Sequence, residues 1–394
     1  MHISVTNTVA RGVPVLLPMA FDCPPLLDAM AAWSSAHLAL QYPSLQDTAL
    51  QHRGRALSNL TASLNTGTLT SEMCLAVAMA MCSMDTISVA TSSSWSHHLA
   101  GAAAALQSKS SNLQAVSHSK ASRPYLDATW LRSFEGKWLL RNFAYHDILM
   151  SVSLDRRPLI AGDYWMSTDD ATADPYFAFA SRIMLLTSEI SVLNADCTEK
   201  FAYGAGSSQP STGGALDSTD DLAADSDFEV LLRRAYSLAM SLREWELPTT
   251  VSGDEPLALL SETYRSAALI YLDRVVRKHF PHYLANVIPE GVQLYVASIC
   301  DIAQKIPEGS LSECSLLFPI FIAGGEAEDE QHIECLRNRL FTMNKWRKFR
   351  NVDACREVLE QVWRCGDEYR HGLRPDRVDW RDVLEQKGWQ LALS

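Results

Sequence analysis

Apolar side chains recur along most of this chain at steps of three and four residues, which is the spacing of one face of an α-helix. Between residues 24 and 40 the pattern joins Leu26, Met30, Trp33, His37 and Leu40. The same spacing predicts further helices over residues 46–64, 71–90, 94–107, 125–154, 175–194, 228–247, 256–275 and 291–306, and around 333–343 and 358–363, with an apolar tail after residue 380 that docks on the body. No stretch alternates like a strand ladder, so the predicted fold class is all-α.

The most apolar stretch, residues 310–330, organises this prediction. Ser310 and Glu313 have the S-x-x-E spacing of a capping box, so a helix is expected to begin there. The apolar run over residues 316–322 follows, and it is too short to span a bilayer. We therefore predict a single large domain over residues 1–394, in which antiparallel helix pairs surround this stretch as a buried central helix.

The end of the central stretch combines helix-breaking residues with negative charge. Pro319 lacks a backbone donor and predicts a kink, and Gly324 with Gly325 is expected to end the helix. Four carboxylates come next: Glu326, Glu328, Asp329 and Glu330. They could hold a cation, but a place at the start of the next helix is favoured, because helix N-termini attract negative charge.

Residues 199–227 differ from the rest of the chain. They are rich in Gly, Ser and Asp and hold few large apolar side chains. Such a segment cannot bury enough apolar area to order itself, so we predict a disordered insertion or a loop. The spacing of its aspartates is not that of a calcium-binding loop.

Residues 71–90 are rich in Met, Ala and Cys on nearly every helical face. Small and adaptable side chains in this arrangement predict a buried helix. Packing in the core is the favoured interpretation. The alternative is that these side chains enclose an apolar pocket that binds a small molecule.

Composition limits the classes of protein to which this chain can belong. Hydrophobic residues make up 47%, as in a globular chain, and the net charge of −12 argues against dominant contacts with nucleic acid or a membrane surface. The nine cysteines form no C-x-x-C pair, which fits a reducing compartment and predicts no bound zinc. The N-terminus lacks the pattern of a signal peptide, and no apolar run is long enough for a membrane span, so no membrane contact is expected.

The sequence carries no recognisable catalytic motif. It has no G-x-S-x-G elbow, no H-E-x-x-H and no phosphate-binding G-x-x-x-x-G-K-[ST] loop. We therefore predict no catalytic residue, no metal ligand and no cofactor, and residues that would bind a cofactor are left unassigned. His37 is favoured as a packed histidine rather than a ligand, and the adjacent His97 and His98 point to different helix faces.

A basic stretch follows the acidic cluster. It has six cationic residues and no acidic one: Arg337, Arg339, Lys345, Arg347, Lys348 and Arg350. Trp346 and Phe349 interleave them, a combination that suits nucleic acid. A solvated face with local ion pairs is favoured instead, because the whole chain is acidic.

Seven segments in order carry a family resemblance. They are PPLLDAMAAWSSAHLAL and ALQHRGRALSNL within 24–60, WSHHLAGAAAALQ at 95–107, LLRNFAYHDILMSVS at 139–153, LSETYRSAALIYL at 260–272, LLFPIFIAGGEA at 316–327 and VLEQVW at 358–363. Together they resemble the fungal-specific transcription factor domain, the helical regulatory region of binuclear zinc-cluster factors in fungi. The resemblance covers nearly the whole chain.

This resemblance implies an all-helical regulatory body that controls transcription, in the nucleus or else in the cytoplasm, as in a pathway-specific regulator of secondary metabolism. Members of the family usually carry an N-terminal cluster of six cysteines, whereas the first cysteine here is Cys23. We therefore expect specific DNA binding to be weak or absent. The expected partners are the transcription machinery or another regulator.

A different class of function stays open beside this one. In it, the chain is a small-molecule-binding helical protein, either a sensor or a recruited biosynthetic enzyme, that uses an apolar interior pocket. Whether the chain is an enzyme is not decided by the sequence, and a non-enzymatic role is favoured. A small-molecule effector and a homodimer are both compatible with the pattern.

Overall fold

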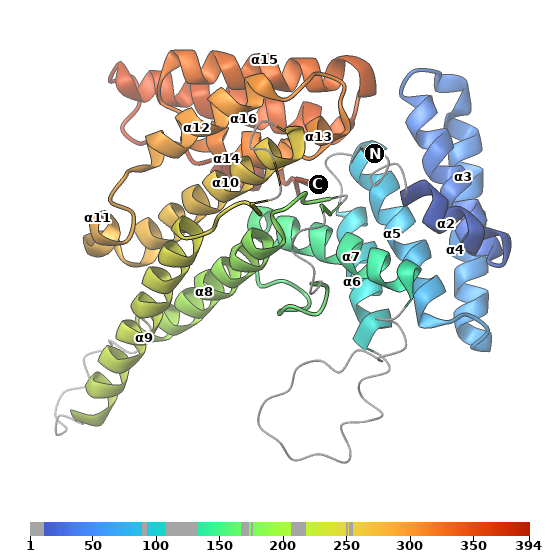
Figure 1. The fold of residues 1–394 in the computed structure, drawn as a ribbon, viewed down its shortest axis with the longest axis horizontal. Coiled ribbons are helices and arrows are strands. Elements are labelled where there is room, and N and C mark those ends of the chain that lie inside the picture. The colour runs from blue at the N-terminus through green and yellow to red at the C-terminus, as the bar shows by residue number, and fades with distance from the viewer. Residues whose placement is uncertain are drawn as a thin grey trace.

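The computed structural model describes residues 12–88, 93–107, 133–166, 173–174, 176–205, 218–249, 251 and 255–394. Within them the regular structure is helical, and the one β-type pairing is an isolated bridge between Asp174 and Ala178. The all-α prediction is confirmed. Figure 1 shows helices packed on helices throughout, with the N-terminal pairs at one end and the C-terminal group above the long middle helices.

Two helix pairs, α3 with α4 and α5 with α6, make up most of the N-terminal part. Its elements are α2 (Gly12–Phe21), α3 (Pro24–Ala39), the 3-10 turn η1 (Pro43–Leu45), α4 (Gln46–Thr66), α5 (Ser71–Ser88) and α6 (Ser94–Gln107). Figure 1 shows α3 beside α4, and α5 beside α6. Gly67 ends α4 with φ of 64°, the left-handed conformation that glycine adopts without strain.

The buried side of α3 is wider than the predicted face. Leu26 is fully buried, and Met30 and Trp33 pack partly buried against the core, as the spacing predicts. Ala29, Ala32 and Ala36 are buried as well, and alanine lets helix backbones approach closely. Hydrophobic spacing ranks the larger side chains first, so it missed these small residues.

The middle helices are α7 (Phe134–Ser153), α8 (Ser181–Ala205), α9 (Ser218–Arg243) and α10 (Pro256–His279). The predicted start of α8 near residue 175 was wrong, because Phe177 lies in a turn. The Asp174 carboxylate accepts hydrogen bonds from the backbone N–H groups of Tyr176, at 2.8 Å, and Phe177, at 3.4 Å, and so stabilises the turn.

Helices also enter both ends of the predicted insertion at 199–227. Helix α8 continues to Ala205, and α9 begins at Ser218. The prediction of an irregular segment is therefore wrong for 199–205 and 218–227. Residues 206–217 lie outside the described residues, so the central part of the insertion stays a prediction.

The C-terminal group surrounds one short helix. Its elements are η3 (Pro281–Tyr283), α11 (Leu284–Val287), α12 (Val292–Lys305), α13 (Leu311–Cys314), α14 (Leu317–Glu326), α15 (Glu330–Arg347), α16 (Arg350–Arg370) and α17 (Trp380–Lys387). All ten residues of α14 are buried, and α10, α12, α15 and α16 pack around it. The predicted buried central helix is confirmed in α14, which lies inside this group in Figure 1.

The beginning of the central stretch is broken rather than kinked. Ser310 caps α13 by accepting from the Glu313 N–H at 3.3 Å, as the capping pattern predicts. Helix α13 then stops after one turn, and Pro319 falls in the first turn of α14, where a missing N–H costs no helical hydrogen bond. The break before Pro319 replaces the kink expected at it.

The two glycines of the stretch lie inside α14 and do not end it. A Cβ on Gly324 would lie 2.7 Å from Leu359 Cδ1, and a Cβ on Gly325 would lie 2.6 Å from Trp380 Cδ1. Their role is to let α16 and α17 approach the central helix, and Trp363 of α16 donates to the Gly324 carbonyl at 2.8 Å. The predicted end at these glycines was wrong because tertiary packing, and not a turn, requires them.

A continuous cluster of buried apolar residues extends from Leu16 to Leu393 and includes Trp380 of the predicted docking tail. The Met- and Cys-rich α5 lies in it, with nearly every side chain from Cys74 to Thr86 buried. The single domain over 1–394 stays a prediction. Among the described helices, none is both long and apolar enough for a membrane span.

Candidate functional site

The basic stretch after the acidic cluster divides into two parts with different surroundings. Arg337 pairs with Glu334 at 2.7 Å and with Glu360 at 2.8 Å. Arg339 is buried, pairs with Glu313 at 3.2 Å and donates to the Ile306 carbonyl at 2.9 Å. The predicted local ion pairs are thus confirmed for the first part.

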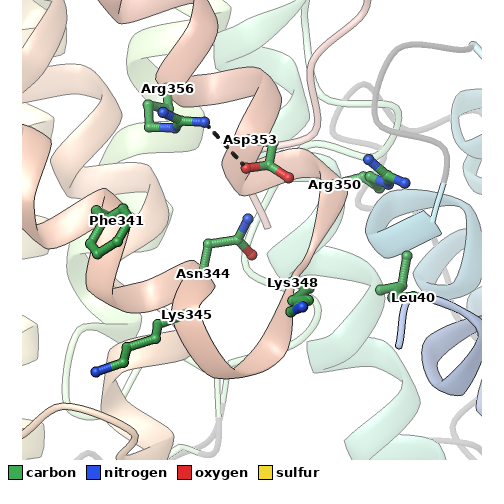
Figure 2. Close-up of a pocket in the computed structure, with 8 residues that line it drawn as sticks. All are labelled: Leu40, Phe341, Asn344, Lys345, Lys348, Arg350, Asp353 and Arg356. Atoms are coloured by element: carbon green, nitrogen blue, oxygen red, sulfur yellow. Dashed lines mark ion pairs between the residues drawn. The ribbon is translucent and has the colours of Figure 1, made fainter. Parts of the chain in front are cut away.

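The second part borders an open pocket of about 440 Å³ (Figure 2). Eight residues line it: Leu40, Phe341, Asn344, Lys345, Lys348, Arg350, Asp353 and Arg356. They come from the end of α3, from α15 and from the first turns of α16, so segments about 300 residues apart in the sequence form one site. Its volume is in the range of ligand and peptide-anchor sites.

The connection between α15 and α16 positions the cationic side chains. Lys348 ends α15 in the left-handed conformation, with φ of 53°, and its N–H still donates to the Asn344 carbonyl at 3.1 Å. Phe349 is the N-cap residue of α16, and its ring lies 5.2 Å from that of His37. This ring contact joins α3 to the connection, and it gives His37 a packing role, as favoured from the sequence.

Positive charge dominates this pocket, which we call the basic pocket. Four cationic residues, Lys345, Lys348, Arg350 and Arg356, line it beside a single carboxylate, Asp353, which pairs with Arg356 at 3.7 Å. The N-terminus of α16 adds the positive end of its macrodipole on the same side. The arrangement attracts anions, although the chain as a whole has a charge of −12.

Two further features of the pocket carry no net charge: an exposed aromatic ring and a buried hydrogen-bond acceptor. Phe341 is 63% exposed and presents an apolar ring at the pocket. The Asn344 Oδ1 is buried, and no donor reaches it from the part of the chain that the structure describes. A ligand with negative charge and an apolar group therefore suits this pocket.

The acidic cluster serves structure in three different ways. Asp329 caps α15 and accepts from the N–H groups of Gln331 and His332, as predicted for a helix N-terminus. Glu328 is exposed and pairs with Arg377. For Glu326 the predicted helix-dipole role is wrong, because this carboxylate is buried at the end of α14 and pairs with Arg274 and with Arg277.

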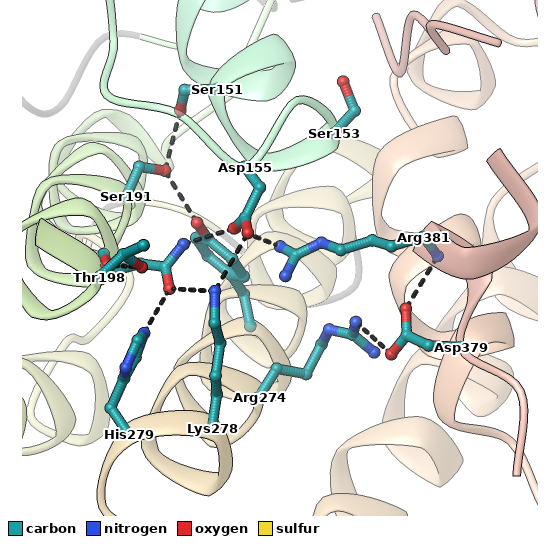
Figure 3. A network of polar contacts seen from close by, with 12 residues as sticks. Ser151, Ser153, Asp155, Ser191, Thr198, Arg274, Lys278, His279, Asp379 and Arg381 are labelled. Carbon is teal, nitrogen blue, oxygen red and sulfur yellow. Dashed lines mark hydrogen bonds and ion pairs between the residues drawn. The ribbon is translucent and has the colours of Figure 1, made fainter. Parts of the chain in front are cut away.

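Arg274 connects the central helix to the C-terminal segment (Figure 3). It is buried in α10 and pairs with Glu326 of α14 and, at 2.6 Å, with Asp379 at the start of α17. Burial alone would raise the pKa of Asp379, but the nearby Arg274 charge lowers it overall. These ion pairs join α10, α14 and the start of α17, so they serve to hold three helices together.

A second polar network in Figure 3 joins α8, α10 and α17. Asp155 follows α7 and pairs with Lys278 at 3.2 Å and with Arg381 at 2.9 Å. Asn194 bonds Asp155 and also His279, at 2.9 Å. The pKa of His279 is lowered to about 4, chiefly by burial and then by the Lys278 charge, so this histidine is neutral at pH 7.

A buried carboxylate on α5 was missed by the sequence reasoning. Asp85 is fully buried and pairs with Arg53 of α4 at 2.8 Å and His98 of α6 at 3.5 Å. An acidic residue inside an otherwise apolar helix was the signal that could have found it. Within the described residues, no group of three or more His, Cys, Asp or Glu is arranged to hold a metal ion.

Comparison with known proteins gives one match. The family model described as the fungal specific transcription factor domain matches residues 13–394. No curated protein and no solved structure matches the chain. The matched range includes every helix that lines the basic pocket and every helix around α14.

Proposed function

The chain belongs to the fungal specific transcription factor domain family, and on that premise we propose that it regulates transcription in the nucleus by binding a partner at the basic pocket. The proposed factor is of the zinc-cluster type. Its partner belongs to the transcription machinery or is another regulator. The partner presents an acidic segment that also carries apolar side chains.

The composition of the pocket supports this partner. An acidic peptide meets the four cations around Asp353, and its apolar side chains cover Phe341. Duplex DNA is the poorer occupant, because it extends past the pocket over a chain with a charge of −12.

The experiment is a tethered reporter assay. The full chain is fused to an unrelated DNA-binding domain in a fungal host, and transcription of a reporter with the matching sites is measured. We expect transcription to differ from that given by the DNA-binding domain alone. An unchanged reporter, with the fusion present at equal protein level, contradicts the regulatory role.

A pair of variants then tests the pocket. Lys348→Glu with Arg350→Glu reverses two exposed cations that line it, and Arg233→Glu reverses an exposed cation on α9 as the matched control. We expect the double variant to lose most of the reporter response and the control to keep it. If both variants keep the full response, the partner binds elsewhere on the chain.

A further inference from the structure

Two cysteines from neighbouring helices meet beside the central helix. Cys300 lies on α12 and Cys335 on α15. The Cys335 Sγ lies 3.7 Å from the Cys300 carbonyl oxygen, and the Cys300 Sγ lies 3.8 Å from the His332 carbonyl oxygen. Each sulfur thus lies against the backbone of the helix that carries the other cysteine, and no disulfide joins them.

The two thiols differ in access and in electrostatic surroundings. Cys300 is only 2% exposed, whereas Cys335 is partly exposed. Gln304 donates to the Cys335 Sγ at 3.3 Å, and this bond stabilises a thiolate. The neighbouring Cys300 thiol lowers the pKa of Cys335 below its usual range, and the neighbouring Cys335 raises the pKa of Cys300.

Other buried cysteines of the chain lack this combination. Burial raises the pKa of Cys82 to about 12, and burial likewise raises the pKa of Cys23 and Cys74. A partly exposed thiol beside a buried second thiol is the arrangement by which redox-sensing cysteines react and then form a disulfide.

We propose that Cys335 and Cys300 are a peroxide-reactive pair, in which Cys335 is oxidised first and Cys300 then resolves it to a disulfide between α12 and α15. The Cys335 thiolate attacks one oxygen of a hydroperoxide and the O–O bond breaks. Cys335 becomes a sulfenic acid, and the other oxygen takes up a proton, equal to the one that the thiol released, and leaves as water or an alcohol. The Cys300 sulfur attacks the Cys335 sulfur and displaces hydroxide, which leaves as water with the Cys300 proton. The two thiols lose two electrons in total, and the hydroperoxide gains them.

The disulfide would close a loop that contains α13 and α14. Oxidation at this pair therefore acts on the helices that hold the central element in place. The inference is independent of the basic pocket, because neither cysteine lines it.

Mass spectrometry of the full chain tests the pair. The reduced protein is treated with hydrogen peroxide at neutral pH, remaining thiols are alkylated, and peptides are mapped over time. We expect Cys335 and Cys300 to disappear together into one cross-linked peptide, at a rate about ten or more times that of the exposed Cys314. Oxidation of Cys314 ahead of Cys335, or the absence of the cross-linked peptide, overturns the proposal on the wild-type protein alone.

Three variants assign the order of the steps. In Cys300→Ser, Cys335 should accumulate as a sulfenic acid that a 1,3-diketone reagent traps, and in Cys335→Ser, Cys300 should stay reduced. Cys314→Ser is the matched control and should form the cross-link at the wild-type rate. If Cys300 is oxidised equally fast without Cys335, the assigned order is wrong.

Discussion

Replacing Gly325 by Ala should destabilise the chain, although alanine is the better helix former. The new Cβ would lie 2.6 Å from Trp380 Cδ1 and 3.1 Å from Trp380 Nε1. The indole is fully buried and cannot move aside easily. Arg274 and Arg381 each lie 5.0 Å from its centroid, and Phe321 packs at 5.2 Å.

Two opposing terms set the size of the effect. Helix propensity favours alanine over glycine by about 1 kcal/mol. Overpacking against a fixed ring costs up to about 3 kcal/mol, so the net loss should be about 2 kcal/mol. Gly324→Ala meets Leu359, whose side chain can rotate, so its net change should be near zero.

Gly54→Ala is the matched control, because Gly54 is also inside a helix and its Cβ would meet no atom within 4 Å. Gly54→Ala should raise the free energy of unfolding by about 1 kcal/mol, so Gly54→Ala and Gly325→Ala should differ by about 3 kcal/mol. The measurement is the free energy of unfolding from urea titrations of the purified variants. Equal stabilisation by Gly325→Ala and Gly54→Ala would refute the close approach of α14 and α17.

Three further predictions follow from buried groups. Phe318 and Phe321 are both fully buried in α14, so replacing either by Ala should cost about 3–5 kcal/mol in unfolding free energy and reduce soluble yield. A near-neutral change would contradict the place of α14 in the core. Glu326→Ala should cost about 3 kcal/mol, because it removes one of the two carboxylates paired with the buried Arg274 and leaves only Asp379. Glu328→Ala, at an exposed pair, should cost about 1 kcal/mol or less, and equal losses in urea titrations would contradict this assignment. Burial lowers the pKa of His146 from 6.5 to about 4, so the folded state excludes a proton that the unfolded chain binds, and stability present above about pH 6.5 is lost as the pH falls. Between about pH 7.5 and 5 His146 should contribute about 2 kcal/mol of this loss. In paired titrations His146→Gln should therefore lose about 2 kcal/mol less than the wild type, while the loss that comes from His279 remains.

Helix type and the core were predictable from hydrophobic spacing. The face of α15 with Ile333, Leu336, Leu340 and Met343 is buried as the spacing predicts. Spacing failed where a second helix decides the role of a residue. Gly324 and Gly325 have the local signature of a helix end, and only the contacts with Leu359 and Trp380 show why they lie inside α14.

The candidate site was predictable only in part. The cations from Arg337 to Arg350 were visible in the sequence, but the sequence could not separate those in ion pairs from those that line the pocket. Leu40 joins the pocket from the other end of the chain, and Arg356 comes from the next helix. Such long-range pairings depend on how α3 packs beside the α15–α16 connection, and no local pattern encodes that.

Peptide binding to the purified chain tests the central claim most directly. A labelled peptide of about 20 residues that combines Asp, Glu, Phe and Leu is titrated in a fluorescence anisotropy assay, beside a peptide with Lys in place of each acid. We predict that the acidic peptide binds and that the basic one does not. The double variant Lys348→Glu and Arg350→Glu should weaken binding about tenfold or more, equivalent to about 1.4 kcal/mol, while Arg233→Glu has no effect. Equal affinity of the wild type and the double variant for the acidic peptide would contradict the account.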